Sequence, residues 1–166
     1  FSVLSEVLTL KDLKKKNIFY NVKGIILSGG PSTVTKGSFP NIPDKIFNLN
    51  IPILGICYGL QLIAKHFKGK VKAQFKKREF GRAILIKKRN SLLTKHFFSK
   101  NKSIVWMSHQ DSVYKLPKGF SKIASTSKSA MAIIEDKKRK IYGIQFHPEV
   151  THTNNGDIIF KNFIFD

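Results

Sequence analysis

Short apolar runs alternate with helical patterns in the first part of the chain. Buried-type runs at 22–28 and 51–56 flank a weak helical pattern at 43–49, and the apolar residues after Tyr58 recur three to four positions apart. These spacings predict strand, helix, strand and helix. Two strands joined through a helix pair in parallel, so this half of the chain predicts a parallel β-α unit.

After Gly69 the pattern changes to shorter runs in which apolar and polar residues alternate, as in strands linked by hairpins. The predicted strands cover 71–75, 82–88, 103–107, 121–126, 130–135 and 140–146. A helical pattern at 156–165 closes the chain, whereas 3–8 predicts a short strand and 10–16 a brief amphipathic turn of helix. The patterns together predict an α/β fold, a three-layer sandwich with a mainly parallel central sheet and a β-rich antiparallel excursion.

Length and charge refine this picture. A chain of 166 residues suits one domain, 1–166, with a sizeable core. Its 30 basic and 10 acidic residues give a net charge of +20, which brings nucleic acid or an anionic membrane to mind as partners. The basic residues are mostly lysines spread over nearly every segment, and base readout favours arginine. We therefore expect a solvated lysine-rich surface with neither nucleic acid nor membrane as partner; an acidic partner surface stays open.

Cysteine usage and hydropathy bear on the compartment. The single cysteine excludes an internal disulfide framework, and the sequence contains neither an apolar run of transmembrane length nor a signal peptide. These features predict a cytoplasmic protein.

The stretch Ile51-Pro-Ile-Leu-Gly-Ile-Cys-Tyr-Gly-Leu-Gln61 has the outline of a nucleophile elbow. An apolar strand runs into Cys57, and a helix pattern follows directly. Gly55 and Gly59 fit positions where a side chain would collide with the strand or the new helix. At a helix N-terminus the thiolate of Cys57 is favoured over the thiol, which makes it a candidate nucleophile. The alternative is an inert buried cysteine.

A second glycine-rich turn, Gly29-Gly30-Pro31-Ser32, ends the strand at 22–28. Two glycines permit a sharp turn with outward-pointing backbone amides, which could hold an anion or an oxyanion. The turn lacks the spacing of a nucleotide-binding loop, so nucleotide binding is weakly supported. The alternative is an ordinary turn.

The stretch Ile144-Gln-Phe-His-Pro-Glu149 carries a candidate base. In an extended chain residues two apart share a face, so Glu149 can reach the ring of His147 and orient it, and Pro148 restrains the geometry. A glycine-flanked cysteine and a carboxylate-paired histidine at two strand ends favour nucleophilic catalysis over a loop turn. The spacing of the histidines and carboxylates matches no metal-site pattern, so no metal is expected.

Five stretches resemble, in order and approximate spacing, the class I glutamine amidotransferases, and among them the amidotransferase domain of the GMP synthetases. These stretches are Leu27-Ser-Gly-Gly-Pro-Ser32, Leu54-Gly-Ile-Cys-Tyr-Gly-Leu-Gln61, Arg78-Glu-Phe-Gly81, Trp106-Met-Ser-His-Gln-Asp111 and Gly143-Ile-Gln-Phe-His-Pro-Glu-Val-Thr-His-Thr153. The last three narrow the resemblance to GMP synthetases through Arg-Glu-Phe-Gly, Trp-Met-Ser-His and Thr-His-Thr.

The resemblance implies a role for each candidate residue. Cys57 would attack the carboxamide of glutamine, His147 would protonate the leaving ammonia and then activate water, and Glu149 would orient His147. The backbone amides of Tyr58 and Gly30 would hold the oxyanion. Three side chains match positions that line the glutamine pocket: Gln61, Ser108 and Gln110, the last standing where many members carry glycine.

Two departures from the family pattern concern the ends of the chain. Members begin with a strand carrying Asp-Phe-Gly-Ser-Gln-Tyr and a helix, and this chain opens after both, at Phe1. It also stops where the amidotransferase domain ends. The resemblance therefore implies a partner, an ATP pyrophosphatase (synthetase) domain or subunit, which would take the ammonia for amination of XMP to GMP. ATP and Mg²⁺ are expected only there, and no cofactor in this domain.

Two other interpretations fit part of the pattern. A cysteine triad alone also suits a free-standing hydrolase such as a γ-glutamyl hydrolase. The second interpretation is an inactive amidotransferase-like remnant or a binding module that contacts a partner through its basic surface.

Overall fold

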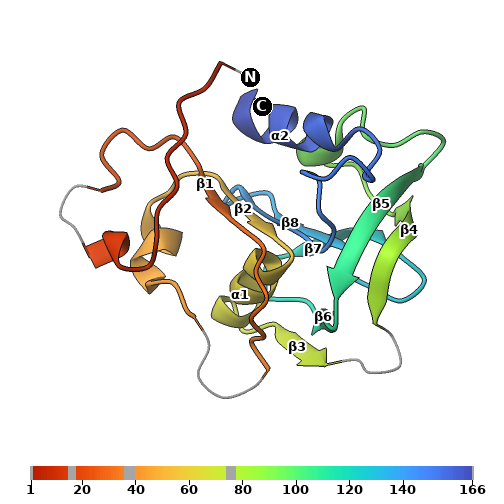
Figure 1. The fold of residues 1–166 in the computed structure, drawn as a ribbon, viewed down its shortest axis with the longest axis horizontal. Coiled ribbons are helices and arrows are strands. Elements are labelled where there is room, and N and C mark those ends of the chain that lie inside the picture. The colour runs from red at the N-terminus through yellow and green to blue at the C-terminus, as the bar shows by residue number, and fades with distance from the viewer. Residues whose placement is uncertain (1, 15–17, 36–39, 74–77, 166) are drawn as a thin grey trace.

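A mixed sheet forms the centre of the computed structural model, which describes residues 2–14, 18–35, 40–73 and 78–165 (Figure 1). Within these residues seven strands share one sheet in the order β1-β2-β9-β8-β7-β4-β5, and β3 pairs with β6 in a separate ribbon. The strands are β1 (Ile25–Leu27), β2 (Ile53–Ile56), β3 (Lys70–Ala73), β4 (Glu79–Lys87), β5 (Lys102–His109), β6 (Asp111–Lys115), β7 (Ser121–Ser125), β8 (Ile133–Asp136) and β9 (Ile141–Ile144). The helices are α1 (Tyr58–His66) and α2 (Gly156–Phe165), with 3₁₀ turns η1 (Asp12–Lys14), η2 (Asp44–Asn48) and η4 (Leu92–Thr94).

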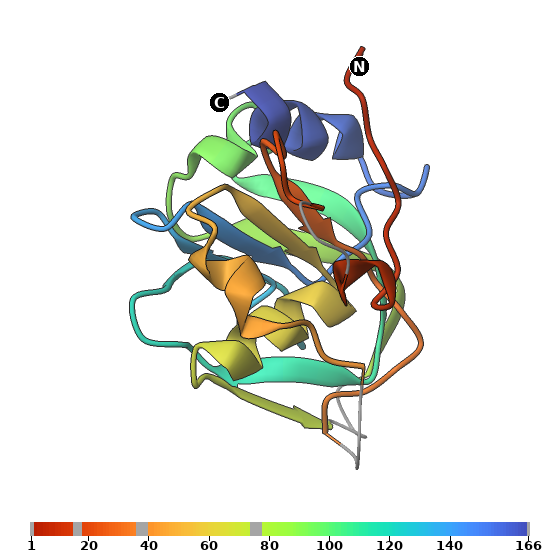
Figure 2. The same ribbon diagram turned by 90° about the vertical axis from the view of Figure 1, so that its left-hand side faces the viewer.

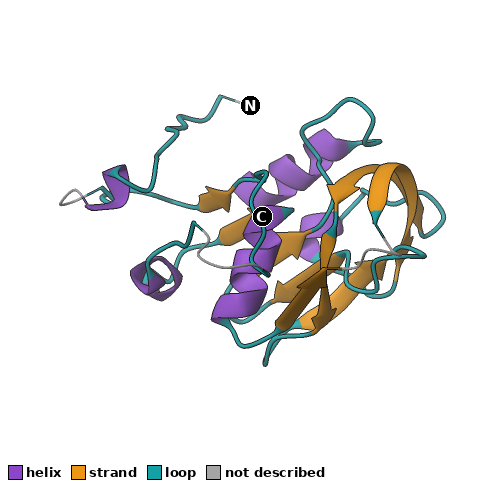
Figure 3. Cartoon of the chain, turned by 60° about the horizontal axis from the view of Figure 1, so that its bottom comes forward, coloured by secondary structure: helices purple, strands orange, loops and turns teal. Residues whose placement is uncertain are grey.

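The sheet changes from parallel to antiparallel at β9. Strands β1, β2 and β9 run parallel, and every further pair from β9 to β5 is antiparallel. Figure 3 shows the strands in orange with the helices beside them in purple. The α/β fold with an antiparallel excursion is therefore confirmed, with three strands in the parallel part. Because β2 and β9 are neighbours, the segments that follow them leave the sheet at the same edge.

The two helices cover opposite faces of this sheet (Figure 2). Alternate residues of β2 show the division: Ile53 packs in the apolar cluster that contains Leu60 of α1, whereas Leu54 packs in the cluster that contains Ile159 of α2. Side chains of successive strand residues point to opposite faces, so both faces of β2 are buried. The expected three layers are present.

The predicted strand at 3–8 is wrong. Residues 2–9 have no regular secondary structure, and Leu4 and Val7 are almost fully exposed. This segment has no neighbouring strand among the described residues, and of its apolar side chains only Leu8 is partly buried, against the cluster that contains Leu60. The helical turn expected at 10–16 is confined to η1, and 15–17 lie outside the described residues.

Three other elements differ from the prediction. The helix expected at 43–49 is the 3₁₀ turn η2. The strand expected at 71–75 ends at Ala73 in β3, and 74–77 lie outside the described residues. Strand β6 was not predicted; it follows β5 after one residue and pairs with β3. None of the helices in the described part of the chain is long and apolar enough to cross a membrane.

Candidate active site

Cys57 lies at the junction between β2 and α1, where the predicted elbow is found. Its backbone has φ +51° and ψ −99°, a conformation that side-chain-bearing residues seldom adopt. The amide of Cys57 donates a 2.7 Å hydrogen bond to the carbonyl oxygen of Ile144, the last residue of β9. The sheet therefore holds this strained residue at the N-terminus of α1.

Glycines on both sides of Cys57 let α1 approach the sheet. A β-carbon at Gly55 would lie 2.6 Å from the carbonyl carbon of Gly59, and one at Gly59 would lie 2.1 Å from the carbonyl oxygen of Leu27. Such contacts are far inside van der Waals distance. The collisions expected at both glycines are confirmed, since Gly55 faces the helix and Gly59 faces β1.

His147 follows β9 by three residues and is fixed by its backbone and its ring. Its amide donates to the carbonyl oxygen of Trp106 in β5 at 3.0 Å, and its Nδ1 lies 2.7 Å from Oε1 of Glu149. The residue between them is Pro148, so the predicted short-range histidine–carboxylate pair is present. With Nδ1 engaged by Glu149, Nε2 is the atom left for chemistry.

Gly29 lies next to both Cys57 and His147. A β-carbon at Gly29 would lie 3.1 Å from Cε1 of His147 and 3.7 Å from Cβ of Cys57. The end of β1, the elbow after β2 and the segment after β9 therefore meet at the same edge of the sheet. Nε2 of His147 is buried and has no partner of ordinary hydrogen-bond geometry among the described residues. Catalytic contacts of this kind are often loose before substrate binds.

The electrostatics of His147 favour its charged form. Interaction with the Cys57 side chain and the hydrogen bond to Glu149 raise the pKa of His147 to about 10, against burial, which lowers it. Burial raises the pKa of Glu149, but the hydrogen bond from His147, a backbone hydrogen bond and the charge of His147 together leave that pKa below its ordinary value. At neutral pH the pair is therefore an imidazolium beside a carboxylate.

Two further groups touch the sulfur of Cys57. Nε2 of Gln145 lies 3.7 Å from it, and the carbonyl oxygen of Ser108 lies 3.8 Å from it. Gln145 is completely buried, and its Oε1 has no hydrogen-bond partner among the residues described. Sequence reasoning missed Gln145, although its place in the motif two residues before His147 was a usable signal.

The residues expected to line the substrate pocket occupy different environments. Gln61 is buried in α1 and donates a 3.1 Å hydrogen bond to the carbonyl oxygen of Asp111. Ser108 is exposed near the end of β5, with its carbonyl at the sulfur. Gln110 is exposed between β5 and β6. The structure thus brings Ser108 to Cys57 directly and links Gln61 to the strand that follows Gln110.

The two expected oxyanion donors lie on the segments next to Cys57 and Gly29. Tyr58 follows Cys57 as the first, buried residue of α1. Gly30 is exposed and directly follows Gly29, which borders both Cys57 and His147. Both residues thus belong to segments that border Cys57 and His147, and their role as oxyanion donors stays a prediction.

A buried polar cluster lies next to Ser108 at the end of β5. His109 of β5 and Glu79 of β4 are paired across the strands at 3.3 Å, and Thr126 donates a 2.6 Å hydrogen bond to Glu79. Burial raises the pKa of Glu79, but hydrogen bonds, the first from His109, hold it below its ordinary value. His109 directly follows Ser108, so the pair anchors the strand end that reaches Cys57.

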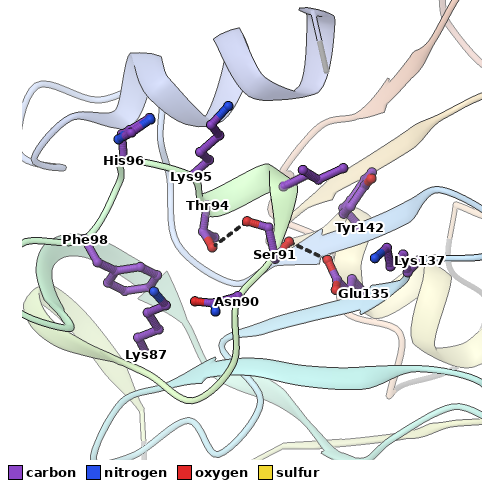
Figure 4. Close-up of a pocket in the computed structure, with 11 residues that line it drawn as sticks. Lys87, Asn90, Ser91, Thr94, Lys95, His96, Phe98, Glu135, Lys137 and Tyr142 are labelled. Atoms are coloured by element: carbon purple, nitrogen blue, oxygen red, sulfur yellow. Dashed lines mark hydrogen bonds between the residues drawn. The ribbon is translucent and has the colours of Figure 1, made fainter.

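A cavity of about 380 Å³ lies elsewhere, between η4 and the β8–β9 turn (Figure 4). In it the hydroxyl of Ser91 donates to Glu135, with Lys137 on the Glu135 side of the cavity and Lys87 on the Phe98 side. The described residues that line it include no member of the Cys57–His147–Glu149 set. Across the described ranges no three His, Cys, Asp or Glu side chains are grouped as metal ligands would be.

The chain matches a protein-family model and is similar to known proteins. The family model described as "Glutamine amidotransferase class-I" matches residues 2–166. The GMP synthase (glutamine-hydrolysing) of Prochlorococcus marinus strain AS9601 is 47% identical over 98% of this chain and 30% of its own length. That of Staphylococcus carnosus is 45% identical over 95% of this chain and 29% of its own length. The chain thus spans about 30% of the length of these relatives.

Solved structures show the same fold. One is a crystal structure from Thermoplasma acidophilum, described as that of a putative GMP synthase subunit. It is 35% identical and has a TM-score of 0.74, covering 88% of this chain and 73% of that one. A glutamine amidotransferase from Thermotoga maritima is 26% identical, with a TM-score of 0.59 over 73% of this chain and 48% of that one.

Proposed function

The chain belongs to the class I glutamine amidotransferases, and from this premise we propose that Cys57, His147 and Glu149 form the triad with which it hydrolyses glutamine. The proposal is supported by the proximity of Cys57 and His147, which both lie next to Gly29, and by the 2.7 Å hydrogen bond between His147 and Glu149. A nucleophile, a base and an acid that orients the base are the parts that acyl transfer from an amide needs.

The first half-reaction breaks the carboxamide bond. The sulfur of Cys57 attacks the side-chain carbonyl carbon of glutamine, and the oxygen becomes an oxyanion held by the amides of Tyr58 and Gly30. His147, charged at neutral pH, gives its proton to the nitrogen, which leaves as ammonia. The γ-glutamyl group is then bound to Cys57 as a thioester.

The second half-reaction releases glutamate. Once the sulfur of Cys57 is acylated, the interaction that most raises the pKa of His147 is weakened, and the neutral ring formed by proton transfer acts as a base. His147 removes a proton from water, the hydroxide adds to the thioester, and glutamate leaves the sulfur. The proton on His147 and the free sulfur are restored.

Four polar residues hold the nucleophile and the substrate. The N–H of Gln145 faces the sulfur and stabilises negative charge there, whereas the Ser108 carbonyl accepts a hydrogen bond from the thiol form. Gln61, Ser108 and Gln110 line the glutamine site. The whole cycle runs on protein side chains and water, so the amidotransferase part uses no cofactor.

The ammonia has its acceptor in a synthetase part, because the curated relatives are GMP synthases more than three times as long as the matched region. In the proposed complete reaction, XMP is activated with ATP and Mg²⁺ by an ATP pyrophosphatase domain or subunit, and ammonia from Cys57 aminates it to GMP. Glutamine and this synthetase part are the proposed partners.

Glutaminase turnover tests the proposal. The chain is incubated with glutamine, and glutamate release is followed with and without the synthetase part. A triad that hydrolyses glutamine releases glutamate and ammonia in equal amounts, and Cys57→Ala abolishes both. Hydrolysis of γ-glutamyl peptides in preference to glutamine would instead identify a γ-glutamyl hydrolase, and no turnover in either setting would identify an inactive binding module.

A further inference from the structure

Strand β4 has an open edge beside the candidate active site. It pairs with β5 along Glu79 to Ile86, but with β7 only at Ile86 and Lys87. From residue 79 to 85 no described strand pairs with its other side. An unpaired stretch of strand presents free N–H and C=O groups and is a ready template for another extended segment.

A groove of about 570 Å³ runs along this open edge, between β4 and the turn at 125–128. Phe80, Arg82, Ile84 and Ile86 all point to its exposed side, because alternate residues of a strand share a face. Phe80 is 61% exposed and Ile84 57% exposed, which is a large apolar exposure for two positions of one strand face that are separated only by Arg82. We call this edge with its exposed side chains the β4 strip.

The charges around the β4 strip are of one sign. Arg82, Lys88, Lys102 and Lys128 line the groove, and its one acidic lining residue, Glu79, is buried against His109. An occupant with apolar side chains alternating with carboxylates would bury the apolar positions and neutralise these cations. A second copy of this chain, with a net charge of +20, is a poor match.

The β4 strip is continuous with the rim of the active site. Phe80 is the cross-strand partner of Ser108, and the carbonyl oxygen of Ser108 lies 3.8 Å from the sulfur of Cys57. A protein that docks on the strip therefore sits next to the place where ammonia is released. Ammonia that escapes to water is protonated and ceases to be a nucleophile, so an acceptor gains by docking there.

We infer that the β4 strip is the docking site for an extended apolar and acidic segment of the synthetase part, which pairs with residues 79–85 as an added strand. The inference rests on the proposed function. It agrees with the relatives, in which about 70% of the length lies outside the region that this chain matches. Backbone pairing would supply affinity, and the alternate side chains Phe80, Arg82 and Ile84 would supply specificity.

The test uses the complete glutamine-dependent synthase, with this chain and its synthetase part present. Ile84→Asp places a charge in the strip away from the triad, and Arg82→Glu reverses its central charge without touching the apolar positions. Leu92→Asp in η4 is the matched control, because Leu92 is 51% exposed and lies outside the groove. Three rates are measured: glutamate release, glutamine-dependent GMP formation and ammonia-dependent GMP formation.

Docking on the strip predicts that both variants lose at least about tenfold in glutamine-dependent GMP formation, while ammonia-dependent formation and basal glutamate release stay within twofold. Leu92→Asp leaves all three rates unchanged. Unchanged glutamine-dependent synthesis in folded Ile84→Asp and Arg82→Glu overturns the inference. A self-associated chain that either variant dissociates also overturns it, because the strip would then hold a second copy.

Hydrogen exchange separates failure of docking from failure of the proposed function. Amides in 79–85 should exchange at least tenfold more slowly in the complete synthase than in the chain alone, and those of β1, the edge strand at the other end of the sheet, should not change. This protection does not depend on turnover. If the amides are protected but no glutamate is released, the proposed function is rejected and the docking site is retained. If glutamate is released but the amides are not protected, the docking site is rejected and the proposed function is retained.

Discussion

The α-carbon of Gly59 faces the carbonyl oxygen of Leu27 so closely that a β-carbon on Gly59 would lie 2.1 Å from it. Gly59 is the second residue of α1, and Leu27 is the last residue of β1. The first turn of α1 is therefore seated against the sheet by the absence of a side chain. Because Cys57 immediately precedes that turn, its orientation depends on the same contact.

Gly59→Ala should lower the free energy of unfolding by about 1–3 kcal/mol, the usual cost of overpacking. Alanine is the better helix former by about 1 kcal/mol, so helix propensity alone predicts the opposite sign. Gly30→Ala is the control, because no atom lies within 4 Å of a β-carbon there. Denaturant unfolding of the three proteins measures the effect, and equal stability of Gly59→Ala and the unmutated chain would contradict it.

The elbow could be predicted from sequence because its signals are local. The glycines flank Cys57 within two residues on each side, and Glu149 lies two residues from His147, so period and sterics alone define both units. The helical pattern at 156–165 likewise coincides with α2. Each of these features depends on residues that are near neighbours in the chain.

The contacts of the sulfur with Gln145 and Ser108 could not be predicted in the same way. They depend on β9 lying beside β2 and on β5 reaching over to the same edge, and the sequence does not state which strands are neighbours. The pairing of Glu79 with His109 depends likewise on the register of β4 and β5. The strand predicted at 3–8 is wrong because its apolar pattern is local, whereas strand formation also requires a neighbouring strand, and no described strand pairs with this segment.

Cys57→Ala should abolish glutamine-dependent GMP formation, with ammonia-dependent formation intact in the complete synthase. The substitution removes the nucleophile and leaves the acceptor reaction untouched. Glutamate release, measured in the same samples, should fall to background. Retention of glutaminase turnover near the unmutated rate would show that another group attacks glutamine.

His147→Ala should be nearly as damaging as loss of Cys57, because it removes both the proton donor and the base. Glu149→Gln should keep measurable turnover, since the amide can still hold the ring through Nδ1 while its charge is lost. The comparison is made on kcat for glutamate release. Equal inactivity of the two variants would mean that the carboxylate does more than orient His147.

Gln145→Leu should lower kcat by about tenfold or more with little change in KM. Leucine keeps a similar volume in a fully buried site but removes the N–H that faces the sulfur of Cys57, and hydrogen bonds to charged groups contribute about 1.5–3 kcal/mol. Thermal unfolding of the same variant serves as the control for folding. A folded variant with unchanged kcat would limit Gln145 to packing.

The pH dependence of stability follows from the shifted pKa of His147. The pKa rises from 6.5 to about 10 on folding, first through Cys57 and then through Glu149. A raised pKa means that the folded protein binds the proton more tightly, so the stabilisation is complete below pH 6.5 and disappears as the pH rises through about 10. Because the pKa of Glu149 is lowered, its own contribution is lost at the acid end, as the pH falls through its folded pKa.

The unfolding temperature of the chain minus that of His147→Gln should therefore be greatest near pH 6 and decline toward pH 10. In a Cys57→Ala background the largest cause of the shift is absent, so the decline should come at lower pH. A difference that stays constant from pH 6 to 10 would mean that His147 carries no proton of raised affinity, and the proposed proton transfer to the leaving ammonia would need another donor.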